Sequence, residues 1–143
     1  MIRKLQFDDY YKNFGKLFQV LSPSAVDISY ETFVDLFHRH SHDNETYVIE
    51  KDNMIIATGK IFFEYKYSRG GSICAHIEDV IVHPDHQNQK LGKKMVEFLI
   101  HLAQKKENVY KIILNCSESN APFYEKFGFK KSEKSPFCMS IYF

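Results

Sequence analysis

A strand followed at once by a polar turn and a helix start is the feature of this sequence with the clearest chemical use. Residues 76–85 read His-Ile-Glu-Asp-Val-Ile-Val-His-Pro-Asp, and Gln-Asn-Gln-Lys-Leu-Gly-Lys occupies residues 87–93. A helix N-terminus presents unpaired backbone N–H groups and the positive end of the helix dipole. With Lys90, Lys93 and Lys94 nearby, the segment predicts a phosphate-binding turn.

Two adjacent carboxylates, Glu78 and Asp79, lie in the strand before this turn. Neighbouring side chains of a regular strand point to opposite faces of the sheet, so we do not expect a paired acid–base site. Instead, one carboxylate could face a ligand while the other holds a loop or a partner chain.

Histidines and cysteines could suggest a metal. Three histidines alternate along the chain: His38, His40 and His42. Alternation is poor ligand spacing on a helix, so no metal is expected. The three cysteines are widely spaced and odd in number, which indicates a reduced intracellular chain. We expect Cys116 to be a small buried hydrophobic residue, because no histidine is positioned to activate it.

The elements that must position these groups follow from periodicity and turn signals. Strands are expected at residues 2–5, 46–49, 54–63, 73–82, 109–116 and 137–143. Helices are expected at residues 8–20, after an N-cap at Ser29, at residues 92–106, and after an N-cap at Asn120. The strand at 109–116 is almost continuously apolar and is predicted to be buried, parallel to the strand at 73–82. This order predicts an α+β fold, a central sheet with helices on its faces.

Length, composition and net charge limit which kinds of protein this chain can be. A chain of 143 residues with 44% hydrophobic residues fits one globular domain, residues 1–143. A formal net charge of +1 argues against binding to nucleic acid or to anionic membranes. No apolar run approaches the roughly 18–20 residues of a membrane span, and the N-terminus lacks a signal-peptide core. We therefore expect a cytoplasmic protein.

The order of elements, with these motifs in it, resembles the GNAT family of acetyl-CoA-dependent N-acetyltransferases. The family's coenzyme motif, Gln/Arg-x-x-Gly-x-Gly/Ala, matches at Gln87 and Gly92, with Lys90 at the middle glycine. Residues 120–129, Asn-Ala-Pro-Phe-Tyr-Glu-Lys-Phe-Gly-Phe, match the family's later motif. His-Ile-Glu-Asp at 76–79 and Tyr-Lys-Ile-Ile-Leu at 110–114 are similar to its amino-sugar branch. The resemblance implies the GNAT (acyl-CoA N-acyltransferase) fold, whose central sheet is mixed, mostly antiparallel, and has a splayed strand pair and flanking helices.

The resemblance also implies a coenzyme site. The pantetheine of acetyl-CoA would pair with the backbone of Val80, Ile81 and Val82 on the splayed strand. The pyrophosphate would lie on seven residues of the turn and helix start: Gln87, Asn88, Gln89, Lys90, Leu91, Gly92 and Lys93. Lys90 could replace the glycine if its φ remains negative. Asn120 would cap its helix and contact the coenzyme secondarily.

Three residues are implied in catalysis: Tyr124, Glu78 and Asn115. Tyr124 would stabilise or protonate the leaving thiolate. A carboxylate, Glu78, or the backbone carbonyl of Asn115 would orient the amine and receive its proton through water. The backbone N–H of Ile81 would stabilise the oxyanion. The amino-sugar branch carries Asp or Glu at the position of Asn115, which keeps an acceptor oxygen but loses the charge.

The implied substrate residues are Ser22, Lys66, Arg69, Glu78, Asp79, Val80, Tyr110, Lys111 and Asn115. Lys66 and Arg69 would bind a sugar phosphate, for which arginine is well suited. Tyr110 and Lys111 could come from a second subunit of a homodimer with shared sites. Tyr142 stands where the family often has an arginine.

We therefore expect direct acetyl transfer from acetyl-CoA to the amine of glucosamine 6-phosphate, giving N-acetylglucosamine 6-phosphate for UDP-N-acetylglucosamine synthesis. One alternative is a GNAT enzyme that acetylates a protein N-terminus, a lysine or another small amine. The other is a coenzyme A-binding sensor without turnover.

Overall fold

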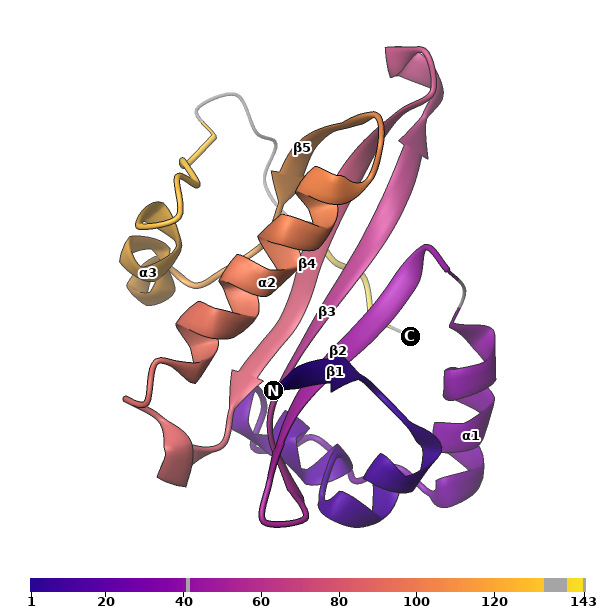
Figure 1. Cartoon of the computed structure of the whole chain (residues 1–143), viewed down its shortest axis with the longest axis vertical. Coiled ribbons are helices and arrows are strands. Elements are labelled where there is room, and N and C mark those ends of the chain that lie inside the picture. Colours follow the sequence, from indigo (N-terminus) through magenta and orange to yellow (C-terminus); the bar gives the residue numbers. More distant parts are fainter. Residues whose placement is uncertain (41, 133–138, 143) are drawn as a thin grey trace.

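A five-stranded sheet forms the centre of the structure (Figure 1). The computed structural model describes residues 1–40, 42–132 and 139–142. The strands are β1 (Ile2–Lys4), β2 (Asn44–Lys51), β3 (Met54–Lys66), β4 (Ser72–Val82) and β5 (Val109–Ile113), and they lie side by side in sequence order. Strands β1 to β4 pair antiparallel, whereas β5 runs parallel to β4. The predicted mixed, mostly antiparallel sheet is confirmed.

Helices cover both faces of the sheet. The α-helices are α1 (Tyr30–Arg39), α2 (Leu91–Lys105) and α3 (Ala121–Glu125). Short 3₁₀ segments are η1 (Phe7–Lys12), η2 (Gly15–Val20), η3 (Tyr67–Arg69), η4 (Pro84–His86) and η5 (Glu118–Asn120). Helix α2 packs across β3 and β4 on one face, and α1, η1 and η2 lie on the other (Figure 1). Ser29 caps α1 as predicted, because its Oγ accepts the N–H of Thr32 at 3.2 Å.

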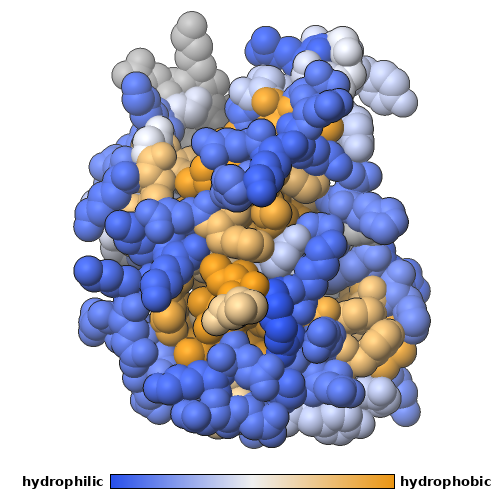
Figure 2. All heavy atoms as spheres, in the orientation of Figure 1, coloured by the Kyte–Doolittle hydropathy of each residue, from blue (hydrophilic) through white to orange (hydrophobic). Residues whose placement is uncertain are grey.

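Each face of the sheet has its own apolar core. On the α2 side, Ile61 and Ile77 pack with Met95 and Leu99. On the other side the core consists of Phe14, Leu17, Phe33, Val48, Ile55 and Ile81. Figure 2 shows apolar side chains across the middle of the α2 face, between polar side chains that cover most of it. The apolar stripe of α2 that faces the sheet consists of the buried residues Met95, Val96, Leu99 and Ala103.

Polar side chains follow the β3–β4 pair on the face away from α2. Cross-strand pairs on this face are Lys60 with Glu78, Phe62 with His76, Glu64 with Cys74, and Lys66 with Ser72. They alternate with Ile61, Phe63, Ala75 and Ile77, which belong to the core under α2. The alternation along β3 and β4 thus gathers ionisable groups into two adjacent rows.

Gly59 lets α2 approach the sheet closely. A Cβ at this position would lie 2.7 Å from Met95 Cγ and 3.0 Å from Leu99 Cδ1. We expect Gly59→Ala to lower the free energy of unfolding by about 1–3 kcal/mol, the usual cost of overpacking. Urea unfolding followed by circular dichroism measures this loss.

Gly92→Ala is the matched control for that prediction. A Cβ at Gly92 would meet Phe123 and Val82 at ordinary contact distances of 3.6 and 3.7 Å. Its free energy of unfolding should stay the same or rise. Equal losses in the two variants would contradict the close-packing explanation.

Residues 8–20 do not form the single α-helix that their spacing predicts. They form η1 and η2, with Asn13 between them at φ 64°. Asp9 is fully buried and accepts two hydrogen bonds from the Arg3 guanidinium at 2.7 Å and one from the Gln6 N–H at 2.8 Å. Burial alone would raise the pKa of Asp9, but these partners outweigh it and lower the pKa. The ion pair with β1 therefore overrides helical periodicity.

The last two predicted strands also differ from the structure. β5 ends at Ile113 and is half exposed, so the prediction of a buried strand to residue 116 is wrong. It lies at the edge of the sheet, where no strand of the described residues covers its outer side. Residues 139–142 are exposed and form no strand, and the remainder of the predicted segment 137–143 lies outside the described residues.

Within residues 1–40, 42–132 and 139–142, every helix is too short or too polar to cross a lipid bilayer.

Candidate active site

The turn between β4 and α2 places a helix start beside the end of a strand. Asn88 and Lys90 have φ values of 65° and 60°, and the first helical hydrogen bond runs from the Lys94 N–H to the Lys90 carbonyl. Lys90 makes no side-chain cap bond. The N–H groups of residues 91–93 precede that first bond and can donate to an anion. Gln87 to Lys90 and Lys93 are exposed, and Leu91 and Gly92 are half-buried.

Lys90 does not have the negative φ under which we expected it to replace the motif's glycine. Its φ of 60° is left-handed, a conformation that glycine adopts without strain and lysine does not. The condition set for Lys90 is therefore not met.

We expect Lys90→Gly to raise the free energy of unfolding by about 0.5–1 kcal/mol, because a left-handed residue with a Cβ is strained. Lys90→Ala keeps the Cβ and should show little of this gain. Urea unfolding of both variants measures the difference. A loss of stability in Lys90→Gly would contradict the strain.

Strand β4 has an open backbone edge where β5 leaves it. Pairing between the two ends at His76 with Ile113, whereas β4 continues to Val82. No strand of the described residues pairs with this side of Val80, Ile81 and Val82. The carbonyl of Val82 accepts a long hydrogen bond of 3.4 Å from Gln87 Nε2. An extended ligand could therefore pair with this edge in the manner of an added strand.

A β-bulge changes the direction of the acidic side chains. Thr58 pairs with Ile81 and Lys60 with Glu78, so Asp79 and Val80 together oppose Gly59, and Asp79 has φ 52°. Asp79 and Lys60 line one cavity of about 250 Å³ on the face away from α2. Lys60 is also the cross-strand partner of Glu78, so the regular alternation on which the prediction of opposite faces rested is interrupted at the bulge.

Helix α3 lies beside the start of α2 and the end of β4. Gly92 is close to both Phe123 and Val82, and the Tyr124 ring packs against Phe123 at 5.0 Å. Burial, and then the nearby Cys116 and Glu78, raise the pKa of the Tyr124 phenol. The phenol is therefore protonated at neutral pH and can donate a hydrogen bond.

Three predicted residues between the end of β5 and the start of α3 are exposed. Cys116 is exposed, so its predicted burial is wrong: β5 has already ended when the chain reaches it. Asn115 and Asn120 are exposed too. Asn120 stands at the predicted cap position of α3, but its side chain makes no cap hydrogen bond.

Four predicted substrate residues gather at the other end of the sheet. The Arg69 guanidinium and the Lys111 ammonium lie 5.2 and 5.5 Å from the centre of the Tyr110 ring. Lys66 is close enough for Tyr110 to influence its pKa, which the hydrogen bond to Glu64 raises most strongly. This cation cluster, Lys66, Arg69, Tyr110 and Lys111, can bind an anion.

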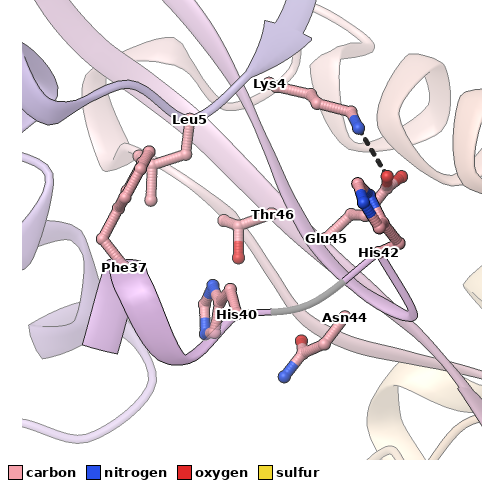
Figure 3. A pocket seen from close by; sticks show the side chains of 8 residues that line it. All are labelled: Lys4, Leu5, Phe37, His40, His42, Asn44, Glu45 and Thr46. Atoms are coloured by element: carbon pink, nitrogen blue, oxygen red, sulfur yellow. Dashed lines mark hydrogen bonds and ion pairs between the residues drawn. The ribbon is translucent and has the colours of Figure 1, made fainter. Parts of the chain in front are cut away.

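Ser22 and the three histidines stand apart from these groups. Ser22 is exposed, and its Oγ lies 2.9 Å from Ser24 Oγ. Figure 3 shows His42 beside the Lys4–Glu45 ion pair and His40 near Thr46. His38 packs on Phe7, at 5.3 Å between ring centres. In the described part of the chain, His38, His40 and His42 do not come together as a group of three ligands.

Sequence reasoning overlooked two residues that the structure places beside the predicted ones. Lys60 shares the cavity of Asp79, and Glu64 binds Lys66 and His76. The available signal was the alternation along β3, because Lys60, Glu64 and Lys66 fall on one face. The sequence alone does not give the register of β3 against β4, which decides the partners of these residues.

Comparisons with known proteins agree with this geometry. The family described as "Acetyltransferase (GNAT) family" matches residues 3–129. Glucosamine 6-phosphate N-acetyltransferase from Schizosaccharomyces pombe is 54% identical over 54% of this chain and 69% of the relative. The enzyme of that name from Arabidopsis thaliana is 38% identical over 99% of this chain and 95% of the relative. A crystal structure of the Arabidopsis enzyme aligns with a TM-score of 0.83 and 35% identity, covering 100% of this chain and 97% of that one.

Proposed function

This chain belongs to the acetyltransferase (GNAT) family, and on that premise we propose that it transfers the acetyl group of acetyl-CoA to the amine of glucosamine 6-phosphate. The observation that carries the proposal is that three features of the structure lie close together. The start of α2, the open edge of β4 and the Tyr124 phenol lie together, which suits a thioester whose far end carries a pyrophosphate.

Acetyl-CoA binds along the open edge and the turn. Its pantetheine pairs with the backbone of residues 80–82, and its pyrophosphate accepts hydrogen bonds from the N–H groups at the start of α2. Gln87 releases the Val82 carbonyl, which it holds only at 3.4 Å. The helix dipole, with Lys90 and Lys93, adds positive potential at the pyrophosphate.

Acetyl transfer is direct and needs no acyl-enzyme. The neutral amine attacks the thioester carbonyl, and a backbone N–H on the open edge of β4, that of Val80 or Val82, stabilises the oxyanion. The expected donor, the Ile81 N–H, faces Thr58 of β3 in the register that the hydrogen bond from the His83 N–H to the Ile56 carbonyl sets. The amine loses its proton through water toward the Glu78 carboxylate, and the backbone carbonyl of Asn115 orients it. When the tetrahedral intermediate collapses, the C–S bond breaks and Tyr124 protonates the leaving thiolate.

The position of the cation cluster supports a homodimer with shared sites. Lys66 pairs with Ser72, and along β4 the distance from Ser72 to Glu78 is about 20 Å at the usual rise per residue. Lys111 pairs with Cys74, about 14 Å from Glu78 along the strand. An amino-sugar phosphate carries its amine and its phosphate on one ring and one short arm, which favours a cluster supplied by a second subunit. The phosphate of a substrate whose amine lies at Glu78 is therefore held by the Lys66, Arg69, Tyr110 and Lys111 cluster of the second subunit.

The product, N-acetylglucosamine 6-phosphate, serves UDP-N-acetylglucosamine synthesis in the cytoplasm under this proposal. A second candidate acceptor is the N-terminal or lysine amine of a protein. The cavity beside Asp79 favours it, because most of its lining is apolar, including Phe14, Phe18 and Phe37.

Steady-state thiol release from acetyl-CoA separates these acceptors. We expect kcat/KM for glucosamine 6-phosphate to exceed that for glucosamine about 100-fold, since charge-assisted hydrogen bonds to the phosphate are lost with glucosamine. Short peptides and free lysine should react more slowly still. Equal rates for the two sugars, or a faster peptide, would overturn the sugar phosphate as acceptor. Acetyl-CoA binding without any thiol release would indicate a sensor.

A further inference from the structure

Glu64, Cys74 and His76 form a cluster of three different ligand types on the face of the sheet away from α2. Glu64 pairs across the strands with Cys74, and His76 is two residues further along β4 on the same face. One carboxylate oxygen, the thiol sulfur and one ring nitrogen all lie within 4.8 Å of one another. None of them takes part in the acetyl transfer described above.

The surroundings of the cluster resemble a metal site more than a simple ion pair. Glu64 Oε2 lies 2.8 Å from His76 Nε2, and its second oxygen, Oε1, accepts from Lys66. The His76 ring stacks on Phe62 with 4.1 Å between centres, which fixes its orientation. Supporting contacts of this kind, a carboxylate held by a neighbour and a histidine held by its packing, are what orient metal ligands.

The Cys74 thiol is available as the third ligand. Cys74 is fully buried, and its one hydrogen bond in the described structure is a long contact of 3.8 Å to the Ala75 carbonyl. A sulfur so weakly engaged is free to coordinate. Ligand atoms of a tetrahedral zinc ion lie about 3.3–3.8 Å apart, so small side-chain adjustments within 4.8 Å would suffice.

We propose that Glu64, Cys74 and His76 bind a divalent transition-metal ion of the zinc class, with water at the fourth position. Thiolate, imidazole and carboxylate ligands together favour Zn²⁺ over the hard ions Mg²⁺ and Ca²⁺. On binding, the Cys74 thiol gives up its proton to solvent, and the ion replaces the hydrogen bond between His76 and Glu64. Lys66 remains hydrogen-bonded to Glu64 Oε1, so the ion lies next to the partner of a residue of the cation cluster.

Titration of the whole chain with Co²⁺ under reducing conditions tests the site. We expect one Co²⁺ per chain, with the visible bands of four-coordinate cobalt and an intense sulfur-to-cobalt band in the near ultraviolet. Zn²⁺ should abolish both by displacement, whereas Mg²⁺ should not. Absence of a sulfur-to-cobalt band in the wild-type chain would overturn the proposal.

Variants assign the ligands. Cys74→Ser should lose the sulfur-to-cobalt band, and His76→Gln and Glu64→Gln should each weaken Co²⁺ binding about 10- to 100-fold. Cys116→Ser, at the exposed thiol, is the matched control and should keep the band. A band that survives in Cys74→Ser, or that disappears only in Cys116→Ser, would contradict the site. If Cys74→Ser fails to fold, unchanged Co²⁺ affinity in folded His76→Gln and Glu64→Gln would contradict it equally.

Discussion

Tyr124→Phe is expected to lower kcat about 100-fold while leaving the Kd for acetyl-CoA nearly unchanged, as for loss of a positioned general acid. Burial and the neighbouring Cys116 and Glu78 raise the pKa of this phenol and keep it protonated. Phenylalanine retains the ring that packs on Phe123 and Phe129 but cannot protonate a thiolate. The coenzyme should still bind through the turn and the open edge of β4.

Thiol-release kinetics and calorimetric titration with acetyl-CoA measure the two quantities separately. Tyr11→Phe is the matched control, because Tyr11 is largely exposed and packs with Tyr10 and Tyr30, away from the site. It should retain wild-type kcat. A Tyr124→Phe enzyme with unchanged kcat would remove the assigned role, and one that loses acetyl-CoA binding would assign Tyr124 to the coenzyme instead.

Arg69→Ala is expected to raise KM for glucosamine 6-phosphate about 10- to 100-fold, with little effect on glucosamine itself. A charged hydrogen bond to phosphate accounts for a change of this size. In the described residues Arg69 has no ion-pair partner and rests on the Tyr110 ring, so its guanidinium is available to an anion. Equal effects on both sugars would contradict a phosphate contact.

Mixing subunits reveals which chain supplies this contact. At glucosamine 6-phosphate concentrations well below the wild-type KM, an Arg69→Ala chain and a Tyr124→Phe chain are each nearly inactive. A mixed dimer with shared sites, however, contains one site with both residues intact. Random exchange should therefore restore about a quarter of the wild-type rate per chain. If the cluster served its own chain, every site would lack one residue and mixing would restore nothing.

The fold could be predicted from sequence where local pattern and packing agree. The amphipathic spacing of α2, predicted at residues 92–106, gives a helix at Leu91–Lys105. Ser29 caps α1, and a two-residue turn at Asp52 and Asn53, both with positive φ, joins β2 to β3. Residues 8–20 show the limit, because a buried ion pair from Asp9 to Arg3 outweighs their helical spacing.

The site was predicted less completely than the fold. The turn at Gln87–Gly92 and the position of Tyr124 came from motifs, and the structure brings them together through Gly92 and Phe123. The direction of Asp79 depends on a bulge opposite Gly59, which regular alternation does not foresee. The exposure of Cys116 depends on where β5 ends.

By itself, the sequence determined strands β1 to β4, helices α1 and α2, the turn between β4 and α2 and the family resemblance, and it supplied the residues proposed to carry the chemistry. These are properties of short segments, where hydrophobic spacing, turn residues and caps act within a few positions. Only the tertiary structure decided the register of β3 against β4, the bulge at Asp79, the left-handed backbone of Lys90 and the separation of the cation cluster from Glu78. Each of these depends on contacts between residues far apart in the chain, whose geometry is fixed only when the sheet and its two cores pack together.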